Sequence, residues 1–527
     1  MSRRPLSDRL ISYLSPGWAA RRARSRLHFE VASQQRAALS SYEAADKGRT
    51  SDDWPSRNKS ADQAITPDYD TLLARARAAV RDNWAAASIS DGYVRHVVGT
   101  GITARAAARD LVSLEPLDNF NAAIDRLWGR WATNPRWVDR ERRKTFVDFQ
   151  SLGIRELIPA GQAFCVASYE PRVDMVGLVL QMFESEQLDT SLSNAGNGNE
   201  IERGVEIDDY GAPVAYHFYE GKHPYTGWRA QSTRILAERV LHLMRPERVR
   251  QTNGVTRMAA VLRELWHAKM YEEYTLLRAR FEACGGVAIE SEPGALGGGF
   301  LGLRTGETTG TPAEDTNSNT QLNIEPNMVW DLPPGKRLNY MDPKVPGSNY
   351  EPFSRQQVKK IAAGAGLDYP TVSRDFSGCT YSGQRQGMIE TWAETEPEQV
   401  RLINLWLRPI REKFVAFAVL EGRVAAPNWN TSAEWRGAYC ETEWQPPAKP
   451  WIDPANQAAA AKLQLEQRLT TRRKILNELG EDYREVLRQT SDEQKLADRL
   501  GITLPESAGD APVNPREPRP AVKEPVL

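Results

Sequence analysis

The segment from Glu351 to Glu390 reads EPFSRQQVKKIAAGAGLDYPTVSRDFSGCTYSGQRQGMIE, and its local signals alternate between helix and turn. Apolar residues at helical spacing predict a helix from Phe353 to Ala363. Pro370 then marks a tight turn, a polar loop follows, and helical spacing resumes from Gln384. The segment contains no catalytic constellation, so it predicts a structural rather than an enzymatic element.

Helical patterns extend outward from this segment in both directions. Strong helix formers without Gly or Pro predict a long helix with a basic first half near the start of the chain. The expected helical stretches are Ala19 to Ala45, Asp68 to Asn83, Gln384 to Leu420 and Ala455 to Leu500. Between the first two, Lys47 to Pro67 is polar and rich in turn residues, so we expect a loop or arm there.

The middle of the chain changes from helical to β-type patterns. Leu178 to Val240 carries short β-type runs between Asn, Gly and Pro turn signals, and predicts a small β-rich element flanked by helices. Within it, GVEIDDYGAPVAYHFY predicts a hairpin with Tyr210 and Gly211 near the turn. The whole chain is therefore expected to be α+β and mainly helical.

One long helix is expected after the β-rich element, from Gly254 to Cys284, with a length on the order of 45 Å. Met270, Tyr274, Leu277 and Phe281 recur on it at three- and four-residue spacing. Its charged residues have mixed signs, which suits either a channel lining, packing in a ring of copies, or a salt-bridged helix of a monomer.

Three later stretches carry weaker signals. Ser291 to Asn319 is rich in Gly, Thr and Asn, which indicates a functional or a disordered loop. Met328 to Asp331 predicts a short strand. The Pro-rich tail after Leu504 lacks the apolar residues of a core and is expected to be disordered.

The overall composition argues against several protein classes. With 68 Lys and Arg against 69 Asp and Glu, the formal net charge is −1, so no global attraction to nucleic acid or an anionic membrane is expected. Four scattered cysteines without a CxxC pair argue against a zinc site and a disulfide framework. We find neither a signal-peptide pattern nor an apolar run of membrane-spanning length.

Motifs of common enzymes are not matched. Gly221-Lys222 and Gly335-Lys336 lack the rest of a phosphate-binding GxxxxGK[ST] loop, so an ATPase is not indicated. The run Cys379 to Gly383 lacks the first glycine of a GxSxG elbow. Gly297 to Gly299 lacks the strand and helix that frame a nucleotide loop. No catalytic residue, metal ligand or cofactor is therefore assigned.

Two charged clusters leave a functional alternative open. His217 and His223 lie near Asp208 and Asp209 in the sequence. We interpret them as ordinary strand and turn residues rather than as a metal site. The basic cluster near the start is either a solvated helix face or a contact for DNA or an acidic scaffold surface; it comprises Arg21, Arg22, Arg24 and Arg26.

The sequence of Glu351 to Glu390 resembles the core signature of lambda-type tailed-phage portal proteins. Further phrases in the family's order include VVGTGI from Val97, the Gly204 to Tyr219 run, and WQPPAKPWIDP from Trp444. The family's Asn-Tyr-Ser-Ser appears here as Cys379-Thr-Tyr-Ser-Gly383, a departure from the pattern.

This resemblance implies a ring, usually of twelve subunits, at the portal vertex of a tailed-phage or prophage capsid. Double-stranded DNA would be packaged and ejected through its channel. The implied partners are other copies of the chain, the large terminase subunit, the major capsid or scaffold protein and head-completion proteins, with no membrane. The implied location is the virion, and the host cytoplasm during assembly.

The family's wing, stem, clip and crown regions imply a division of this chain. We expect an N-terminal helix and arm (1–67), wing (68–177), β-rich clip with adjoining stem (178–243), stem helix (244–286), channel loop and wing (287–380), wing to helical crown (381–504) and a disordered tail (505–527). The DNA-channel candidates are Arg263, Lys269, Arg278, Arg280 and Arg304. The family-signature loop residues are Asp375, Ser377, Tyr381, Ser382 and Arg385.

Two alternatives remain. Another ring-forming head-tail connector or adaptor would differ by having no packaging role, and terminase binding would separate the two. An unrecognised hydrolase or nuclease would need a cluster of acidic and histidine residues, for which Asp208 and Asp209 are the test positions.

Overall fold

The computed structural model describes residues 16–39, 57–220, 231–283, 287–291, 336–340, 350–449 and 453–502. The chain divides into two compact units, residues 1–60 and residues 61–527, and each is described by itself. The first unit contains helix α2 (Pro16–Leu39), which confirms the expected basic helix as far as Leu39. All four arginines of the basic cluster on this helix are exposed; they are Arg21, Arg22, Arg24 and Arg26.

The second unit is mainly helical. Its α-helices are α3 (Ala61–Ile65), α4 (Tyr69–Asp82), α5 (Trp84–Val97), α6 (Asp118–Thr133), α7 (Pro135–Val138), α8 (Phe146–Ala160), α9 (Leu262–Ala283), α10 (Tyr350–Ala365), α11 (Tyr369–Ser373), α12 (Tyr381–Leu402), α13 (Arg408–Leu420), α14 (Ala433–Cys440), α15 (Pro454–Glu466), α16 (Arg472–Glu478) and α17 (Tyr483–Leu500). The π-helix η5 (Ile403–Leu407) joins α12 to α13, and the short 3₁₀ turns are η2 (Ser185–Gln187) and η4 (Ala237–Arg239). Together with the strands, these helices confirm the predicted α+β, mainly helical class.

The described residues also form four small antiparallel sheets. They are β1 (Thr103–Ala106) with β11 (Thr442–Gln445); β3 (Leu178–Phe183), β2 (Gln162–Tyr169) and β8 (Val240–Met244); β4 (Glu200–Glu202), β5 (Val205–Ile207), β6 (Pro213–Glu220) and β7 (Gln231–Leu236); and β9 (Val287–Ser291) with β10 (Lys336–Tyr340). The β-rich element predicted for Leu178 to Val240 is confirmed. Because β3 and β8 both pair with β2, however, the expected boundary at 177/178 runs through a sheet.

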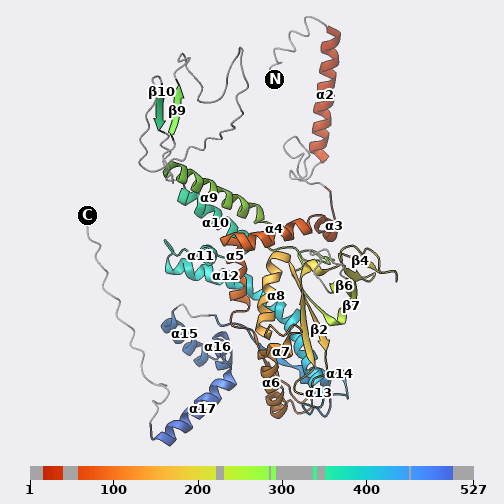
Figure 1. Ribbon diagram of the computed structural model, residues 1–527, viewed down its shortest axis with the longest axis vertical. Helices are drawn as coiled ribbons and strands as arrows, with labels where there is room; N and C mark the ends of the chain where they lie inside the picture. Colours follow the sequence, from red (N-terminus) through yellow and green to blue (C-terminus); the bar gives the residue numbers. More distant parts are fainter. Residues whose placement is uncertain are drawn as a thin grey trace, which may run out of the picture. The chain divides into compact units, whose positions relative to one another are not determined.

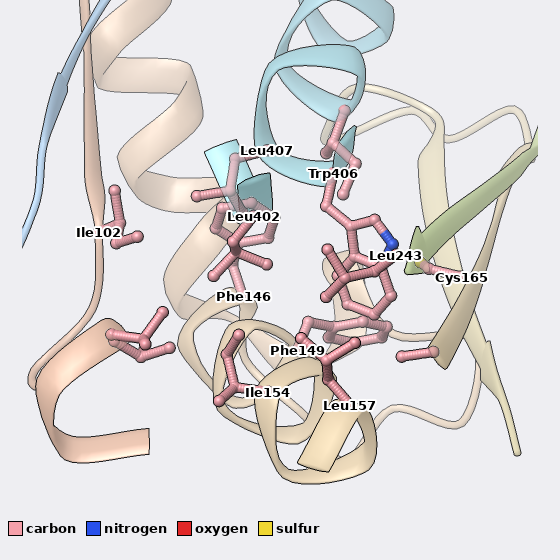
Figure 2. Packing of buried hydrophobic residues seen from close by; sticks show 14 of the residues in the cluster. Ile102, Phe146, Phe149, Ile154, Leu157, Cys165, Leu243, Leu402, Trp406 and Leu407 are labelled. Atoms are coloured by element: carbon pink, nitrogen blue, oxygen red, sulfur yellow. The ribbon is translucent and has the colours of Figure 1, made fainter. Parts of the chain in front are cut away.

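The main core lies where α5, α8, the β3-β2-β8 sheet, η5 and α13 meet. Figure 2 shows Trp406 of η5 pointing toward Phe149 of α8 within this cluster. The Trp406 side chain is fully buried, and its indole Nε1 donates to the Leu241 carbonyl at 3.0 Å. A Cβ at Gly153 would lie 2.6 Å from the same indole, so a glycine is required at this approach of α8 to η5. The π turn therefore places one aromatic side chain between a helix and a sheet.

The expected hairpin is confirmed between β5 and β6. The Asp208 carboxylate accepts hydrogen bonds from the backbone N–H groups of Tyr210 (2.9 Å) and Ala212 (2.8 Å), and Gly211 adopts φ 84°. These are the turn chemistry and the left-handed glycine that the local sequence indicates. The prediction that Asp208 lies in a turn is thus correct, and its carboxylate is occupied by the backbone.

The predicted helix from Gly254 is wrong at its start, because α9 begins only at Leu262 and spans 22 residues. Residues before it pack against the end of α8 and the start of β2 instead. The Gly254 N–H donates to Gln162 Oε1 at 2.8 Å, and the Thr256 hydroxyl donates to the Ile158 carbonyl at 3.0 Å. At 1.5 Å per residue, α9 is about 33 Å long rather than about 45 Å.

The helix expected from Phe353 to Ala363 is confirmed as α10, which lies beside α9 (Figure 1). Tyr271 of α9 stacks on Tyr350 at 5.8 Å and meets Phe353 edge-on at 4.9 Å. On the rest of α9, Tyr274 and Leu277 are 66% and 55% exposed, so the apolar stripe predicted for this helix is only partly covered.

The remaining expectations divide into three groups. The loop or arm expected from Lys47 to Pro67 is wrong near its end, because α3 forms there, and Asp62 in its first turn accepts from the Thr252 N–H at 3.0 Å. Helical stretches expected from Asp68, Gln384 and Ala455 are confirmed, the last as three helices. The strand expected at 328–331, the tail after 504 and nearly all of 291–319 lie outside the described residues. Among the helices that the structure describes, none combines the length and apolar character of a membrane span.

Candidate channel helix and signature loop

The signature segment forms α10, the short helix α11, a loop and the start of α12. Asp368 caps α11 by accepting from the Thr371 N–H at 3.2 Å, and Pro370 occupies the first turn, where its missing N–H costs nothing. The Thr391 hydroxyl of α12 donates to the same carboxylate at 3.1 Å. Arg374 ends α11 in the left-handed region with φ 56°. Pro370, expected in a tight turn, thus lies in the first turn of a short helix, and one acidic cap ties this helix to α12.

Asp375 is the centre of a hydrogen-bonded network in the loop. Its Oδ1 accepts from the Ser377 hydroxyl (2.5 Å) and N–H (2.9 Å), and its Oδ2 accepts from the Tyr369 hydroxyl (2.9 Å). Arg355 of α10 contributes an ion pair at 3.3 Å. The Ser377 hydroxyl and N–H, followed by Tyr369, lower the pKa of Asp375 to about 2. Two of the five signature residues, Asp375 and Ser377, are thus brought into direct contact.

The other three signature residues lie on the first turns of α12. Thr380 caps this helix by accepting from the Gly383 N–H at 3.2 Å, and Tyr381, Ser382 and Arg385 follow it on the helix. Tyr381 is 53% exposed. In this chain the cap is supplied by Thr380, at the point where the sequence departs from the family's wording. The structure does not join these three residues to the Asp375 network.

A hollow of about 310 Å³ lies beside the signature loop and contains residues that the sequence did not single out. Arg95 and His96, at the end of α5, line it together with Arg374 and Phe376. Burial, and then the positive charge of Arg95, lower the pKa of His96 below its usual range, so this imidazole is neutral near pH 7. The charged groups of the hollow are therefore the guanidinium groups of Arg95 and Arg374 and the carboxylate of Asp368. No local signal connects α5 to the loop, because their proximity is a product of the tertiary fold.

The basic residues expected to line a channel are distributed over different sides of α9. A residue advances about 100° around an α-helix, so Arg263 and Arg278 fall on one side and Lys269 and Arg280 on another. Lys269 pairs with Glu273 at 3.9 Å. It also lies toward α4, because its charge, after that of Arg81, lowers the pKa of Asp82 at the end of that helix. The four candidates therefore cannot all face one surface, and Arg304 lies outside the described residues.

A second hollow, of about 680 Å³, separates α4 from the first turns of α9. Leu72, Ala79 and Leu265 give it apolar lining, and Trp266, 59% exposed, stands at its side. The hollow is also lined by three basic side chains and one acidic side chain, which are Arg75, Arg263, Lys269 and Asp82. Periodicity alone did not indicate this hollow, because it requires two helices that are far apart in the sequence.

A polar joint fixes the base of α9 to α12. Arg257 pairs with Glu394 and, at 3.6 Å, with Glu398, and its guanidinium lies 4.9 Å from the Tyr93 ring centroid. Burial raises the pKa of Glu398 despite the nearby Arg401 and Arg257 charges. Tyr93 donates to the Ala365 carbonyl at 2.8 Å, which brings the end of α10 to the same joint. The channel-helix candidate and the signature segment are thus parts of one connected structure.

The acidic and histidine cluster considered for a metal has a structural explanation. His217 Nε2 lies 3.3 Å from the buried Glu206 carboxylate, which also receives two hydrogen bonds from Arg234. The hydrogen bond from Arg234 is the largest of the causes that lower the pKa of Glu206. Within the described ranges, no group of three or more His, Cys, Asp or Glu side chains is arranged to hold a metal ion. His223 lies outside those ranges.

Comparison with known proteins gives consistent results over most of the chain. The family described as "Phage portal protein, lambda family" matches residues 47–399. A "Probable portal protein" of Halomonas phage phiHAP-1 is 27% identical over 485 residues, which cover 88% of each chain. "Portal protein B" of Escherichia phage lambda is 24% identical over 87% of this chain and 90% of its own.

Among solved structures, a chain from the "Neck of empty GTA particle computed with C6 symmetry" matches with a TM-score of 0.40 and 14% identity, covering 79% of this chain and 93% of its own. The family match, in contrast, spans both the α9 to α10 region and most of the signature helix α12. The resemblance noted in the sequence is thereby confirmed: this chain belongs to the lambda family of phage portal proteins.

Proposed function

We propose that copies of this chain close into a ring at a capsid vertex, and that double-stranded DNA passes through the channel of the ring during packaging and ejection. The observation that carries the proposal is the family match over residues 47–399. It is supported by α9, an exposed helix with charged and apolar residues that this chain leaves partly uncovered. A closed ring of copies supplies each subunit with two neighbours, and hence with partners for such surfaces.

The charge balance suits a conduit. A formal net charge of −1 gives the chain no strong overall attraction to DNA. If every copy neutralised several phosphates, the counterion-release contribution would multiply around the ring and hold the DNA in place. Weak and local contacts leave DNA free to move.

We propose that α9 and α10 form the stem of each subunit. The two helices pack side by side, and the β9–β10 pair lies between them in sequence (Figure 1). The clip expected at 178–243 is not retained for β3 and β8; because both strands pair with β2, which lies in the expected wing, we propose that they belong to the wing. The C-terminal helices α15 to α17 stay assigned to the crown.

For the DNA-facing side of the stem we propose Arg278 or Arg280 first. The two arginines lie on opposite sides of α9, so only one of them can face the DNA. Both lie in the distal half of α9, away from the joint at Arg257 that ties this helix to α12. Lys269 is a weaker candidate because it already pairs with Glu273 and lines the hollow beside α4. The partners proposed for the assembled ring are the large terminase subunit, the capsid or scaffold protein and head-completion proteins, met in the host cytoplasm before the particle is complete.

The first experiment measures the mass and shape of the purified chain by mass photometry with negative-stain imaging. Twelve copies of the 59.2 kDa chain would give a ring near roughly 700 kDa with a central hole. A folded single copy under every condition, including addition of scaffold or capsid protein, would contradict the proposal. Binding of large terminase to the ring then distinguishes a portal from another connector of the particle.

The channel assignment is tested by two single variants, Arg278→Ala and Arg280→Ala. We expect both to form rings of unchanged mass and one of them to package an altered amount of DNA, because only the arginine on the channel side contacts passing phosphates. Arg436→Ala is the matched control, since Arg436 is an arginine on α14, outside the proposed stem. Packaging equal to that of the control would remove these residues from the channel.

A further inference from the structure

The loop between β1 and α6 presents three apolar side chains to solvent from a tightly bonded turn. Leu111, Val112 and Leu114 are 40%, 86% and 66% exposed, and together we call them the apolar tip. Isolated exposed apolar residues are common on protein surfaces and need no explanation. Three of them on one short turn form a local patch, which raises the question of what they contact.

The apolar tip is rigidly held. The Asp110 carboxylate accepts from the N–H groups of Val112 (2.8 Å) and Ser113 (2.9 Å), and the Leu114 N–H donates to the Asp110 carbonyl at 2.9 Å. The Arg109 guanidinium donates to the Leu114 carbonyl at 3.1 Å. An Asx-type turn of this kind is common in surface loops, but a binding element gains affinity when it is ordered before it binds.

The base of the turn is anchored in the core. Asn121, which is 4% exposed, accepts from the Ala108 N–H at 3.0 Å and donates to the Ala108 carbonyl at 3.1 Å. The Leu117 N–H bonds to the same carbonyl, so the two ends of the loop are closed together. The tip is therefore a rigid projection from the β1 to α6 corner rather than a loose connection.

The backbone of the tip is strained to present its side chains. Leu114 adopts φ 58°, the left-handed region in which a branched apolar residue is disfavoured and glycine is preferred. In the isolated chain this strain has no compensating burial, because Leu114 remains 66% exposed. Strained backbone that the surrounding structure enforces is a feature of binding elements.

The charges around the tip select the kind of partner. Glu115 and Asp118 are exposed beside it, and with Asp110 they make three carboxylates. Two guanidinium groups face them, those of Arg109 and of Arg484, which lies 4.0 Å from Asp118, so the margin is acidic by one charge. An acidic margin opposes DNA phosphates and anionic lipids. It favours a protein surface with an apolar socket and a basic margin.

We propose that the apolar tip docks into an apolar, basic-margined socket of the shell protein that surrounds the portal ring. The inference rests on the proposed function, because a ring seated at a vertex must be held by the shell through surfaces outside its channel. The tip lies on the β1 to α6 corner and not on the stem pair α9 and α10, which leaves it available in a ring whose stems line the channel.

The test combines ring formation with entry of the ring into shells. The full-length chain is co-expressed with the major shell protein of the same particle, and the portal content of purified shells is measured by quantitative mass spectrometry. The test variant carries Val112→Ser and Leu114→Gly, which remove the apolar groups while suiting the backbone at position 114. The matched control carries Val173→Ser and Val249→Ser, at valines that are 94% and 93% exposed elsewhere.

We expect the test variant to form rings of wild-type mass. Its entry into shells should fall by a factor of roughly ten or more, as for residues that dominate an interface. The control should match the wild type. Reversing the margin with Glu115→Lys and Asp118→Lys should also lower entry, and more so at low salt. Wild-type entry of the tip variant would overturn the proposal, and so would loss of the ring itself, which would make the tip a contact between copies. Failure of the unaltered chain to form any ring would instead overturn the proposed function.

Discussion

Trp406 and Trp266 lie in two regions of the molecule that differ in how far the chain itself buries their side chains. Trp406 lies in the π turn η5, fully buried between α8 and the β3-β2-β8 sheet, with its N–H bonded to a strand carbonyl. Trp266 lies in the first turns of α9, 59% exposed at the side of a large hollow. The first region is completed within one chain, whereas the second has contact surface that the single chain leaves open.

The same difference separates the polar contacts of the two regions. Around the main core, Arg411 is 1% exposed, pairs with Asp125 at 2.7 Å and stacks over Trp128. On α9, the described pair of Lys269 and Glu273 is separated by 3.9 Å and partly exposed. Buried charges need a partner to offset desolvation, and exposed ones do not. The core is thus fixed by the fold, while α9 is free to use its charges in assembly.

The largest expected effect comes from truncating the buried tryptophan. Trp406→Ala should lower the free energy of unfolding by about 3–5 kcal/mol, since a large core side chain and its hydrogen bond are lost. Trp266→Ala should lower it by less than about 1 kcal/mol, because this side chain is largely exposed. Urea unfolding, at concentrations where mass photometry finds single copies, measures both.

The two variants should reverse their order in assembly. Trp266→Ala should reduce the fraction of chains in rings while the single copy stays folded, whereas any Trp406→Ala chain that folds should retain its α9 surface. Equal losses of stability in the two variants would remove the distinction between the two regions.

A smaller effect is expected from the glycine that admits Trp406. Gly153→Ala places a Cβ where the indole would lie 2.6 Å away, and overpacking of this kind should destabilise the chain by about 2 kcal/mol. Gly129→Ala is the matched control, because Gly129 also lies within a helix but has open space around its Cβ position. It should instead stabilise the chain by up to about 1 kcal/mol. Thermal unfolding of both variants decides this, and a neutral Gly153→Ala would show that η5 shifts to make room.

Local chemistry explains what the sequence could predict. The turn at Asp208 and Gly211 and the helical stretches depend on neighbours within a few residues, so pattern and residue type sufficed to predict them. The start of α9 was wrong because Gly254 and Thr256 bond to β2 and α8, which overrides the local preference for helix.

Tertiary contacts account for the rest of the candidate site. Arg95 meets the signature loop, and Arg257 meets Glu394, only after distant segments have packed together. Periodicity identified the stripe through Tyr274 and Leu277, but the spacing of apolar residues on a helix does not say whether the cover comes from the same chain or another. The signature residues were found by family resemblance, and the structure then separated Asp375 and Ser377 from the three on α12.

The smallest expected effect concerns the exposed Asp375 network, which extends the comparison from packing to hydrogen bonding. Its folded-state pKa of about 2 lies below the ordinary value of 3.8, so the stability it contributes is present above the ordinary pKa and is lost as the pH falls through about 2. Ser377→Ala removes the hydroxyl that is the largest cause of this depression, so the pKa of Asp375 should rise toward 3.8 and the carboxyl should begin to titrate at higher pH. Carbon-13 NMR of labelled aspartate carboxyls, followed from neutral pH down through the ordinary aspartate range, measures this directly, with Ser382→Ala as the control on α12, outside the network. A titration of Asp375 unchanged by Ser377→Ala would show that the loop is not held by this network, and would leave α11 and its Asp368 cap as what fixes the signature segment.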